Sequence, residues 1–279
     1  MNDFSLPERG HPVDEWKLSP RALREKIRRG EWVHSTSGLC PGYVQANLAI
    51  LPKESALEFL QFCERNPKPC PLIYVTDPGE PILREIAEGA DLRTDLPAYR
   101  VFKDAQLTEE VTDISPFWRD DLVSFLLGCS HTFDAILHRA GFVLPHFARN
   151  KTPCVFTTRI ACRSAGHFSG PLVVSARAIP ASRVPEAVLL TARHKLAHGA
   201  PVHVGYPQGL GIDHFPHSEY GGTDLVLAPD ELPVFWACGV TPQAVAMASK
   251  IPWMITHKPG HMFVTDLTIE QLADDTVHG

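Results

Sequence analysis

The stretch from Val234 to Asp266 constrains the fold and the site of this chain more than any other segment. It holds two short apolar runs, 234–237 and 253–256. Each leads directly into a group of residues whose side chains can act in catalysis or ligand binding. A short apolar run bounded by Gly and Pro is typical of a buried strand. Because α/β proteins build their sites from polar groups just past buried strands, the sequence predicts a pocket where these two strands end.

The candidate residues after the two runs are Cys238, Thr241, Gln243, His257, His261 and Asp266. Histidine titrates near neutral pH, so His261, or His257 as second choice, suits general acid/base catalysis or substrate binding. The alternative is that each only caps backbone groups of a turn. The two histidines are four residues apart, but Pro259 lies between them and argues against a helix. No carboxylate or Cys lies at a recognisable metal-ligand spacing, so we expect no metal site.

Asp266 follows the apolar run 262–264 and has two interpretations. It could orient the imidazole of His261 and stabilise its protonated form, as the aspartate of a hydrolytic triad does. Alternatively, Asp266 or Thr268 starts a short helix as its N-cap. Both roles are compatible.

A second cluster, Cys129-Ser130-His131-Thr132, follows a long apolar run. Cys129 or Cys238 could act as a nucleophile, with His131 as partner of Cys129. Adjacent residues on a helix point in different directions, however, so Cys129 and His131 need not meet. The alternative is that these thiols and hydroxyls are buried and line a pocket.

Arg159 and Arg177 interrupt β-rich apolar runs. A buried Arg needs an anionic partner, and Arg159 is our candidate for gripping a substrate carboxylate with its bidentate fork. The alternative is an internal ion pair with Asp95, Asp120 or Asp121. Gln45 and Asn47 share one face of a predicted strand, where they either present amides to a ligand or pair with buried backbone.

The chain also resembles a known family. Its segments FWACGVTPQ and ITHKPGHMFVTD look like the hallmark motifs of the D-glutamate cyclase family. Further matching segments are GYVQANLAIL (42–51), NPKPCPLIYVTDPGEP (66–81), TDLPAYRV (94–101), WRDDLVSFLLGCSHTF (118–133), GPLVVSARAIP (170–180) and HGAPVHVGYP (198–207). The resemblance spans about Gly38 to Leu267. It implies an intramolecular dehydration in which D-glutamate closes to 5-oxo-D-proline, although many bacterial members carry only a hydro-lyase label.

Composition excludes several other classes of protein. The net charge is −6 with no basic stripe, which argues against nucleic-acid binding. No apolar run reaches the roughly 18 residues of a membrane span, and no signal peptide is recognisable. Seven scattered cysteines suggest reduced thiols and a cytoplasmic protein. The glycine-rich segments lack the spacing of phosphate loops, so we expect no cofactor. The sequence is compatible with a homo-oligomer.

The order of predicted elements indicates a mixed α/β protein, with α+β as the alternative. Helical patterns dominate the N-terminal half and short strands the C-terminal half, with mixed β-sheets shared between them. We expect a flexible arm over 1–18. A catalytic domain follows over 19–279, either single or made of two intimate subdomains dividing near residue 150. Residues 42–47 and 239–244 share a Gly followed by a Gln, which is too little to establish a duplication.

Three candidate functions remain. The first is a cofactor-independent hydro-lyase acting on a small carboxylated amine, in which backbone amides, Thr241, Gln243 or Ser130 stabilise the carbonyl oxygen. The second is a non-catalytic binder of a small carboxylate, linked to amino-acid or oxoproline metabolism. A Cys-dependent hydrolase or amidase is a third alternative, which thiol alkylation would test.

Overall fold

The computed structural model describes residues 15–149, 151–220 and 224–273. Most of the predicted arm, residues 1–14, lies outside the described residues; its last part forms a 3-10 turn, η1 (Glu15–Lys17). The α-helices are α1 (Pro20–Arg28), α2 (Lys53–Arg65), α3 (His131–Arg139), α4 (Pro145–Ala148), α5 (Val184–Ala192), α6 (Thr241–Ala248) and α7 (Ile269–Ala273). Further 3-10 turns are η2 (Ser115–Phe117), η3 (Ala181–Arg183), η4 (Lys195–Ala197) and η5 (Pro207–Leu210).

Strands come from both halves of the chain. They are β1 (Tyr43–Pro52), β2 (Leu72–Val75), β3 (Ile82–Leu83), β4 (Ala90–Asp91), β5 (Tyr99–Lys103), β6 (Gln106–Val111), β7 (Leu122–Gly128), β8 (Cys154–Ala161), β9 (Pro171–Pro180), β10 (His203–Val204), β11 (Glu231–Ala237), β12 (Trp253–His257) and β13 (Phe263–Thr268). The mixed α/β class is therefore confirmed. Helices and strands are more evenly divided along the chain than the sequence pattern suggested.

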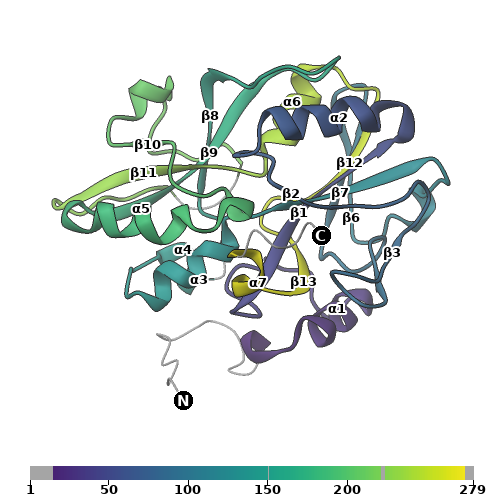
Figure 1. The fold of residues 1–279 in the computed structure, drawn as a ribbon, viewed down its shortest axis with the longest axis horizontal. Coiled ribbons are helices and arrows are strands. Elements are labelled where there is room, and N and C mark those ends of the chain that lie inside the picture. The colour runs from purple at the N-terminus through teal and green to yellow at the C-terminus, as the bar shows by residue number, and fades with distance from the viewer. Residues whose placement is uncertain (1–14, 150, 221–223, 274–279) are drawn as a thin grey trace.

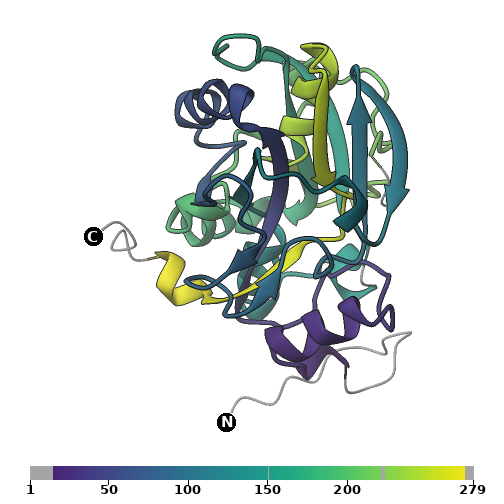
Figure 2. The ribbon, with the colours of Figure 1, turned by 90° about the vertical axis from the view of Figure 1, so that its right-hand side faces the viewer.

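Two antiparallel sheets form the centre of the molecule (Figure 1). The larger sheet has the order β2-β7-β1-β12-β5-β6, and β13 also pairs with β1. The smaller sheet has the order β10-β11-β9-β8. At one end of the molecule α1 packs against β13 (Figure 2). This helix begins at a Ser19 cap, whose Oγ accepts from the Ala22 amide at 3.2 Å, with Pro20 in its first turn.

The two sheets contain the same structural unit twice. The β1–β7 ladder runs from the pair Ala46–Gly128 to the pair Pro52–Leu122. The β9–β11 ladder runs from Val174–Ala237 to Pro180–Glu231, without a register shift in either. In each unit the first strand leads into a helix, α2 or α5, and the second strand leads into α3 or α6. The register thus equates residues 42–47 with 170–175, and not with the segment 239–244 that looks similar in sequence.

Neighbouring strands continue the equivalence. β2 pairs with β7 as β10 pairs with β11, so that Val75 and Val204 lie opposite equivalent residues. On the other side, β12 flanks β1 and β8 flanks β9. β8, the outer strand of the second unit, follows α3 of the first unit in the chain. β12, the outer strand of the first unit, follows α6 of the second. The two units are therefore linked by exchange of strands.

The helices of the two units pack in mixed pairs. Phe59 and Phe62 of α2 share one core with Val245 and Ala246 of α6. On the other side, Phe133 of α3 and residues of α5 belong to the larger core. Figure 1 shows α2 beside α6 and α3 beside α5. The core therefore extends between the units.

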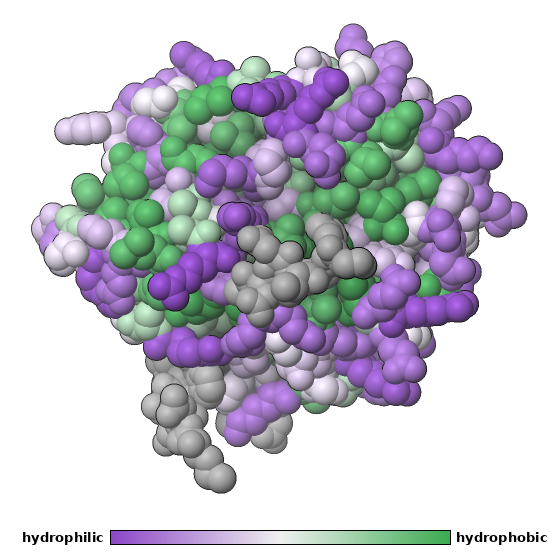
Figure 3. Space-filling model, viewed as in Figure 1, coloured by the Kyte–Doolittle hydropathy of each residue, from purple (hydrophilic) through white to green (hydrophobic). Residues whose placement is uncertain are grey.

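The surface mixes hydrophobic and hydrophilic side chains. The face in Figure 3 carries hydrophobic areas on the side of α5, where Leu189 is exposed, and on the side of α2, where Leu57 is exposed. Hydrophilic side chains interrupt these areas. Among the described residues, no helix has the length and hydrophobicity required to cross a membrane.

Candidate active site at the strand–helix junctions

Two equivalent junctions carry several of the predicted site residues. The first joins β7 to α3 through Cys129 and Ser130, and the second joins β11 to α6 through Cys238 and Gly239. A strand that runs directly into a helix presents the amide groups of the helix N-terminus at the sheet edge, where they favour anionic groups. Each junction has a Cys as its first residue after the strand.

Close packing explains the glycines at these junctions. A Cβ on Gly239 would lie 1.9 Å from Nδ2 of Asn47, and a Cβ on Gly128 would lie 1.5 Å from the carbonyl oxygen of Leu196. Asn47 also donates from Nδ2 to the Gly128 carbonyl oxygen at 2.5 Å. The Asn47 side chain therefore holds the end of β7 while packing against the other junction.

Both junction thiols are buried and protonated. Burial raises the pKa of Cys238 to about 11 and that of Cys129 well above the ordinary range. The amide of His131 donates to Cys129 Sγ at 3.5 Å. Because the thiolate is the reactive form of cysteine, the geometry argues against either thiol as a nucleophile.

A buried ionic network lies next to the first junction. The Arg177 guanidinium donates from Nε and Nη2 to the two carboxylate oxygens of Asp134, both at 2.9 Å. It also donates to Ser130 Oγ at 2.9 Å and to Ser175 Oγ. On the other side of the carboxylate, His146 Nε2 donates to Asp134 at 3.0 Å. One carboxylate thus joins a buried arginine to a histidine.

The charges of this network stabilise each other. Burial alone would raise the pKa of Asp134, but Arg177 and His146 outweigh it and hold that pKa well below its usual range. The guanidinium also faces the rings of Phe133 and Trp236, with 4.9 Å and 5.6 Å from its carbon to the ring centroids. Asp134 is therefore ionised at neutral pH and holds the imidazole of His146 in one tautomer.

This network borders a pocket of about 430 Å³. His146, Arg177 and Cys154 line it, and Arg149 stands at its exposed rim. Its volume is within the range of small-ligand pockets. Since Nε2 of His146 is bonded to Asp134, the other ring nitrogen, Nδ1, is the one available to a ligand. The Arg149 guanidinium has no partner among the described residues.

His257 and Gln243 lie deeper. His257 is buried on β12, and its Nδ1 lies 3.1 Å and 3.2 Å from the backbone nitrogen and oxygen of Leu48. Burial lowers its pKa to about 4, so the ring is neutral. Gln243 donates to the His257 carbonyl oxygen at 2.9 Å. Within the described part of the chain, Gln243 Oε1 and His257 Nε2 have no hydrogen-bond partner.

Thr241 and Gln45 are used by the fold itself. Thr241 Oγ1 donates to the Cys238 carbonyl oxygen at 2.7 Å. Gln45 donates from Nε2 to the carbonyl oxygens of Thr36 and Leu39, and accepts from the Thr36 hydroxyl. Both side chains fix backbone segments around the junctions.

His261 lies in a different surface hollow, of about 510 Å³, which it lines with Lys258 and Glu110. Its Nδ1 lies 3.0 Å from the Pro259 carbonyl oxygen, so it ties the Pro-Gly turn together. Burial lowers its pKa. The lining of this hollow shares no residue with the pocket of His146.

Two predicted residues have other roles. Arg159 is exposed near the end of β8 and pairs with Asp213, so the expectation of a buried carboxylate clamp at Arg159 is corrected. Asp266 belongs to β13 and pairs with Arg24 at 2.9 Å. Asp266 thus neither orients His261 nor starts the last helix, where Thr268 Oγ1 instead accepts from the Gln271 amide.

Sequence reasoning missed two members of the network. It weighed Arg177, but with Asp95, Asp120 or Asp121 as the partner; the structure pairs Arg177 with Asp134, whereas Asp95 pairs with Arg28. The spacing of Ser130 and Asp134 by one helical turn was the available signal. No motif marked His146.

Comparison with known proteins decides the family. The sequence model of the D-glutamate cyclase family matches residues 123–266. A protein of Rubrobacter xylanophilus is 56% identical over 87% of this chain and 93% of its own length. This chain belongs to the D-glutamate cyclase family.

Other relatives agree. One from Stutzerimonas stutzeri is 53% identical over 92% of this chain and 96% of its own, and one from Geobacillus kaustophilus is 51% identical over 92% and 97%. All three carry the provisional name of hydro-lyase. A nitrogen repressor-like protein from Methanococcus jannaschii aligns over 90% of this chain and 99% of its own with 10% identity, but its TM-score of 0.37 carries no argument.

Proposed function

We propose that this member of the D-glutamate cyclase family is a hydro-lyase that closes D-glutamate to 5-oxo-D-proline in the pocket of His146. The family membership supports the reaction class. The observation that carries the choice of site is the hydrogen-bonded series Arg177–Asp134–His146, which ends at a pocket of about 430 Å³. A histidine oriented by a buried carboxylate is a recurrent arrangement for proton transfer.

The stoichiometry of lactam closure suits a single imidazole. The ammonium nitrogen of glutamate loses two protons as it forms the amide bond with the γ-carbon. The departing carboxylate oxygen gains two protons and leaves as water. His146 holds its Nε2 proton towards Asp134 and takes a proton from the ammonium at Nδ1. It then returns this proton to the departing oxygen and repeats the transfer, so no net proton is stored.

Charge recognition assigns the remaining roles. Arg149 at the rim is placed to pair with the α-carboxylate of the substrate, and a guanidinium can grip a carboxylate through two hydrogen bonds. The guanidinium of Arg177 also lines the pocket, and in this proposal its N–H groups face the oxyanion of the tetrahedral intermediate. Within this proposal no metal or cofactor is required.

The test is turnover by the purified full chain. D-glutamate and L-glutamate are incubated separately, and 5-oxoproline is followed by chiral chromatography with and without a chelator. We expect product from D-glutamate, unaffected by chelation. Binding of D-glutamate without product would overturn the proposal in favour of a non-catalytic carboxylate-binding protein. Complete loss of turnover in chelator, restored by one divalent ion, would show that the reaction requires a metal.

A further inference from the structure

A second pocket, of about 470 Å³, lies between the ends of α2 and α5. It shares no lining residue with the pocket of His146. Its walls come from the equivalent connections of the two units, the one from α2 to β2 and the one from α5 to β10. Most of its lining is apolar, including Pro71, Leu72, Ala192 and Leu196. Such a cavity favours a ligand with an apolar body.

His198 supplies an unsatisfied acceptor in this lining. The residue is 1% exposed, and its Nδ1 lies 2.6 Å from the Lys68 carbonyl oxygen. A carbonyl oxygen only accepts, so Nδ1 carries the proton and Nε2 keeps a lone pair in the neutral ring. Burial lowers the pKa of His198 to about 4, so the ring stays neutral at pH 7. In the described part of the chain Nε2 has no hydrogen-bond partner, and a buried acceptor without one is costly.

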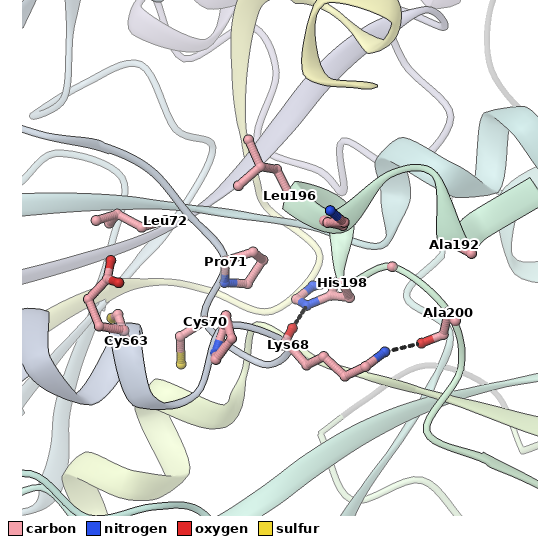
Figure 4. A pocket seen from close by; sticks show the side chains of 13 residues that line it. Cys63, Lys68, Cys70, Pro71, Leu72, Ala192, Leu196, His198 and Ala200 are labelled. Carbon is pink, nitrogen blue, oxygen red and sulfur yellow. Dashed lines mark hydrogen bonds between the residues drawn. The ribbon is translucent and has the colours of Figure 1, made fainter. Parts of the chain in front are cut away.

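Lys68 supplies a cation in the same lining. Its Nζ donates to the Ala200 carbonyl oxygen at 2.6 Å, and a Cβ on Gly199 would lie 3.9 Å from it. Figure 4 shows the Lys68 side chain running along one edge of the pocket towards Ala200, with the His198 ring beside Pro71. The side chain is exposed, but the surrounding protein desolvates the ammonium enough to lower its pKa. An anion at this edge would restore favourable interactions of the charge.

We propose that this pocket binds a small amphipathic carboxylic acid of the N-acyl amino acid class. Its carboxylate pairs with Lys68, its amide N–H donates to Nε2 of His198, and its acyl chain lies on the apolar wall. The cation and the acceptor both belong to the lining of this one pocket, so a ligand that carries a carboxylate close to an N–H would pair with both. Binding there is independent of the reaction proposed for the pocket of His146.

Isothermal titration of the full chain tests this, with N-octanoylglycine as probe. N-octanoylsarcosine, which lacks the N–H, and the methyl ester of N-octanoylglycine, which lacks the anion, are the matched ligands. We expect each to bind about 10-fold or more weakly than the probe, because each leaves one buried or charged partner unpaired. Equal affinity for all three would overturn the recognition of both groups.

Variants locate the site. Lys68→Met keeps an apolar side chain but removes the charge and should weaken the probe about 10-fold or more, whereas Lys53→Met, an exposed lysine at the other end of α2, should not. Ala192→Phe fills the pocket and should abolish binding. Unchanged affinity in folded Ala192→Phe, displacement of the probe by D-glutamate, or no binding of the probe at about 1 mM would each overturn the proposal.

Discussion

Thr132 and Thr241 make the same contacts in the two halves of the molecule. Thr132 Oγ1 lies 3.2 Å from the Gln45 amide nitrogen and 3.4 Å from its carbonyl oxygen. Thr241 Oγ1 lies 3.1 Å and 3.4 Å from the same two atoms of Val173. In each case a hydroxyl in the first turn of a helix joins that helix to the neighbouring strand. The duplicated unit therefore includes the side-chain contacts that fix the two junctions.

The two junctions have diverged where chemistry is possible. The position of Ser130 in the first junction corresponds to Gly239 in the second, and that of Asp134 to Gln243. Only the first junction thus provides a carboxylate, which Arg177 of the second unit neutralises. The proposed site therefore lies at only one of the two junctions, although both have the same backbone arrangement.

Replacement of His146 tests the proton-transfer role. His146→Gln should lower turnover of D-glutamate about 10²-fold or more, the usual contribution of a general acid/base. The control is His167→Ala, because His167 is exposed, pairs with Glu58 and is not part of the pocket lining. Chiral chromatography gives turnover and thermal unfolding gives the folded fraction. Normal turnover per folded His146→Gln molecule would remove His146 from the mechanism.

Removal of the buried carboxylate should be strongly destabilising. Asp134→Asn leaves the Arg177 guanidinium buried without a counter-charge, which typically costs about 3–5 kcal/mol in the free energy of unfolding. The double variant Asp134→Leu/Arg177→Met removes both charges and should recover a large part of this loss. Urea unfolding measures all three proteins. A loss below about 1 kcal/mol in Asp134→Asn would mean that water or another group already compensates the arginine.

The sequence predicted the strands that end at the site but not the contacts within it. The apolar runs 234–237 and 253–256 lie in β11 and β12, and Cys238 follows directly after its strand. The partners Asp134 and Arg177 are far apart in the chain, so no local pattern indicates that they meet. Their contact depends on the packing of α3 from one unit against β9 from the other.

Two errors have a common physical origin. Arg159 and Arg177 both interrupt β-rich runs, but β8 becomes exposed towards its end whereas β9 is covered along most of its length. Asp266 lies within β13 and pairs with Arg24 of α1, whereas the last helix begins after Thr268, the other residue that the pattern offered as its N-cap. The pattern of apolar residues indicates a strand. It does not show how far along that strand other elements bury its side chains.

A methyl group at position 239 should destabilise the protein, because Gly239 packs directly against Asn47. Gly239→Ala places a Cβ against the Asn47 amide, and overpacking of this kind costs about 1–3 kcal/mol. In Gly239→Ala/Asn47→Ala the clash is removed, so the double variant should lose less stability than the two single losses added together. Urea unfolding of the four proteins gives the coupling. Additive losses would mean that the two residues do not press on each other.

Buried neutral histidines should make the fold sensitive to mild acid. The pKa is lowered to about 4 in His198 and His257 and to about 3 in His131. In the unfolded chain these rings titrate near 6.5, so below that pH the unfolded state binds more protons. The free energy of unfolding should therefore fall as pH decreases from about 6.5 to about 4. Across this interval each histidine lowers the free energy of unfolding by at most about 1.4 kcal/mol per pH unit.

Unfolding in urea at pH 7 and pH 5 checks this expectation. The variant His257→Asn keeps an amide able to reach the Leu48 backbone but does not titrate, so its stability should depend less steeply on pH. Identical pH dependence in the variant and the parent protein would show that His257 is not kept neutral by the fold.

Thiol accessibility tests the cysteine alternative. None of the seven cysteines, which all lie in the part of the chain that the structure describes, forms a disulfide; Cys162 is half-buried and the other six are buried. Burial raises the pKa of Cys162 to about 11, as it does for Cys238, so neither forms much thiolate near neutral pH. Iodoacetamide at pH 7.5 should therefore label the native chain at Cys162 alone, and only slowly, and should leave turnover unchanged. Mass spectrometry locates the label, with urea-unfolded protein as the control in which all seven react. Rapid labelling of Cys129 or Cys238 together with loss of turnover would instead place a nucleophilic thiol in the reaction.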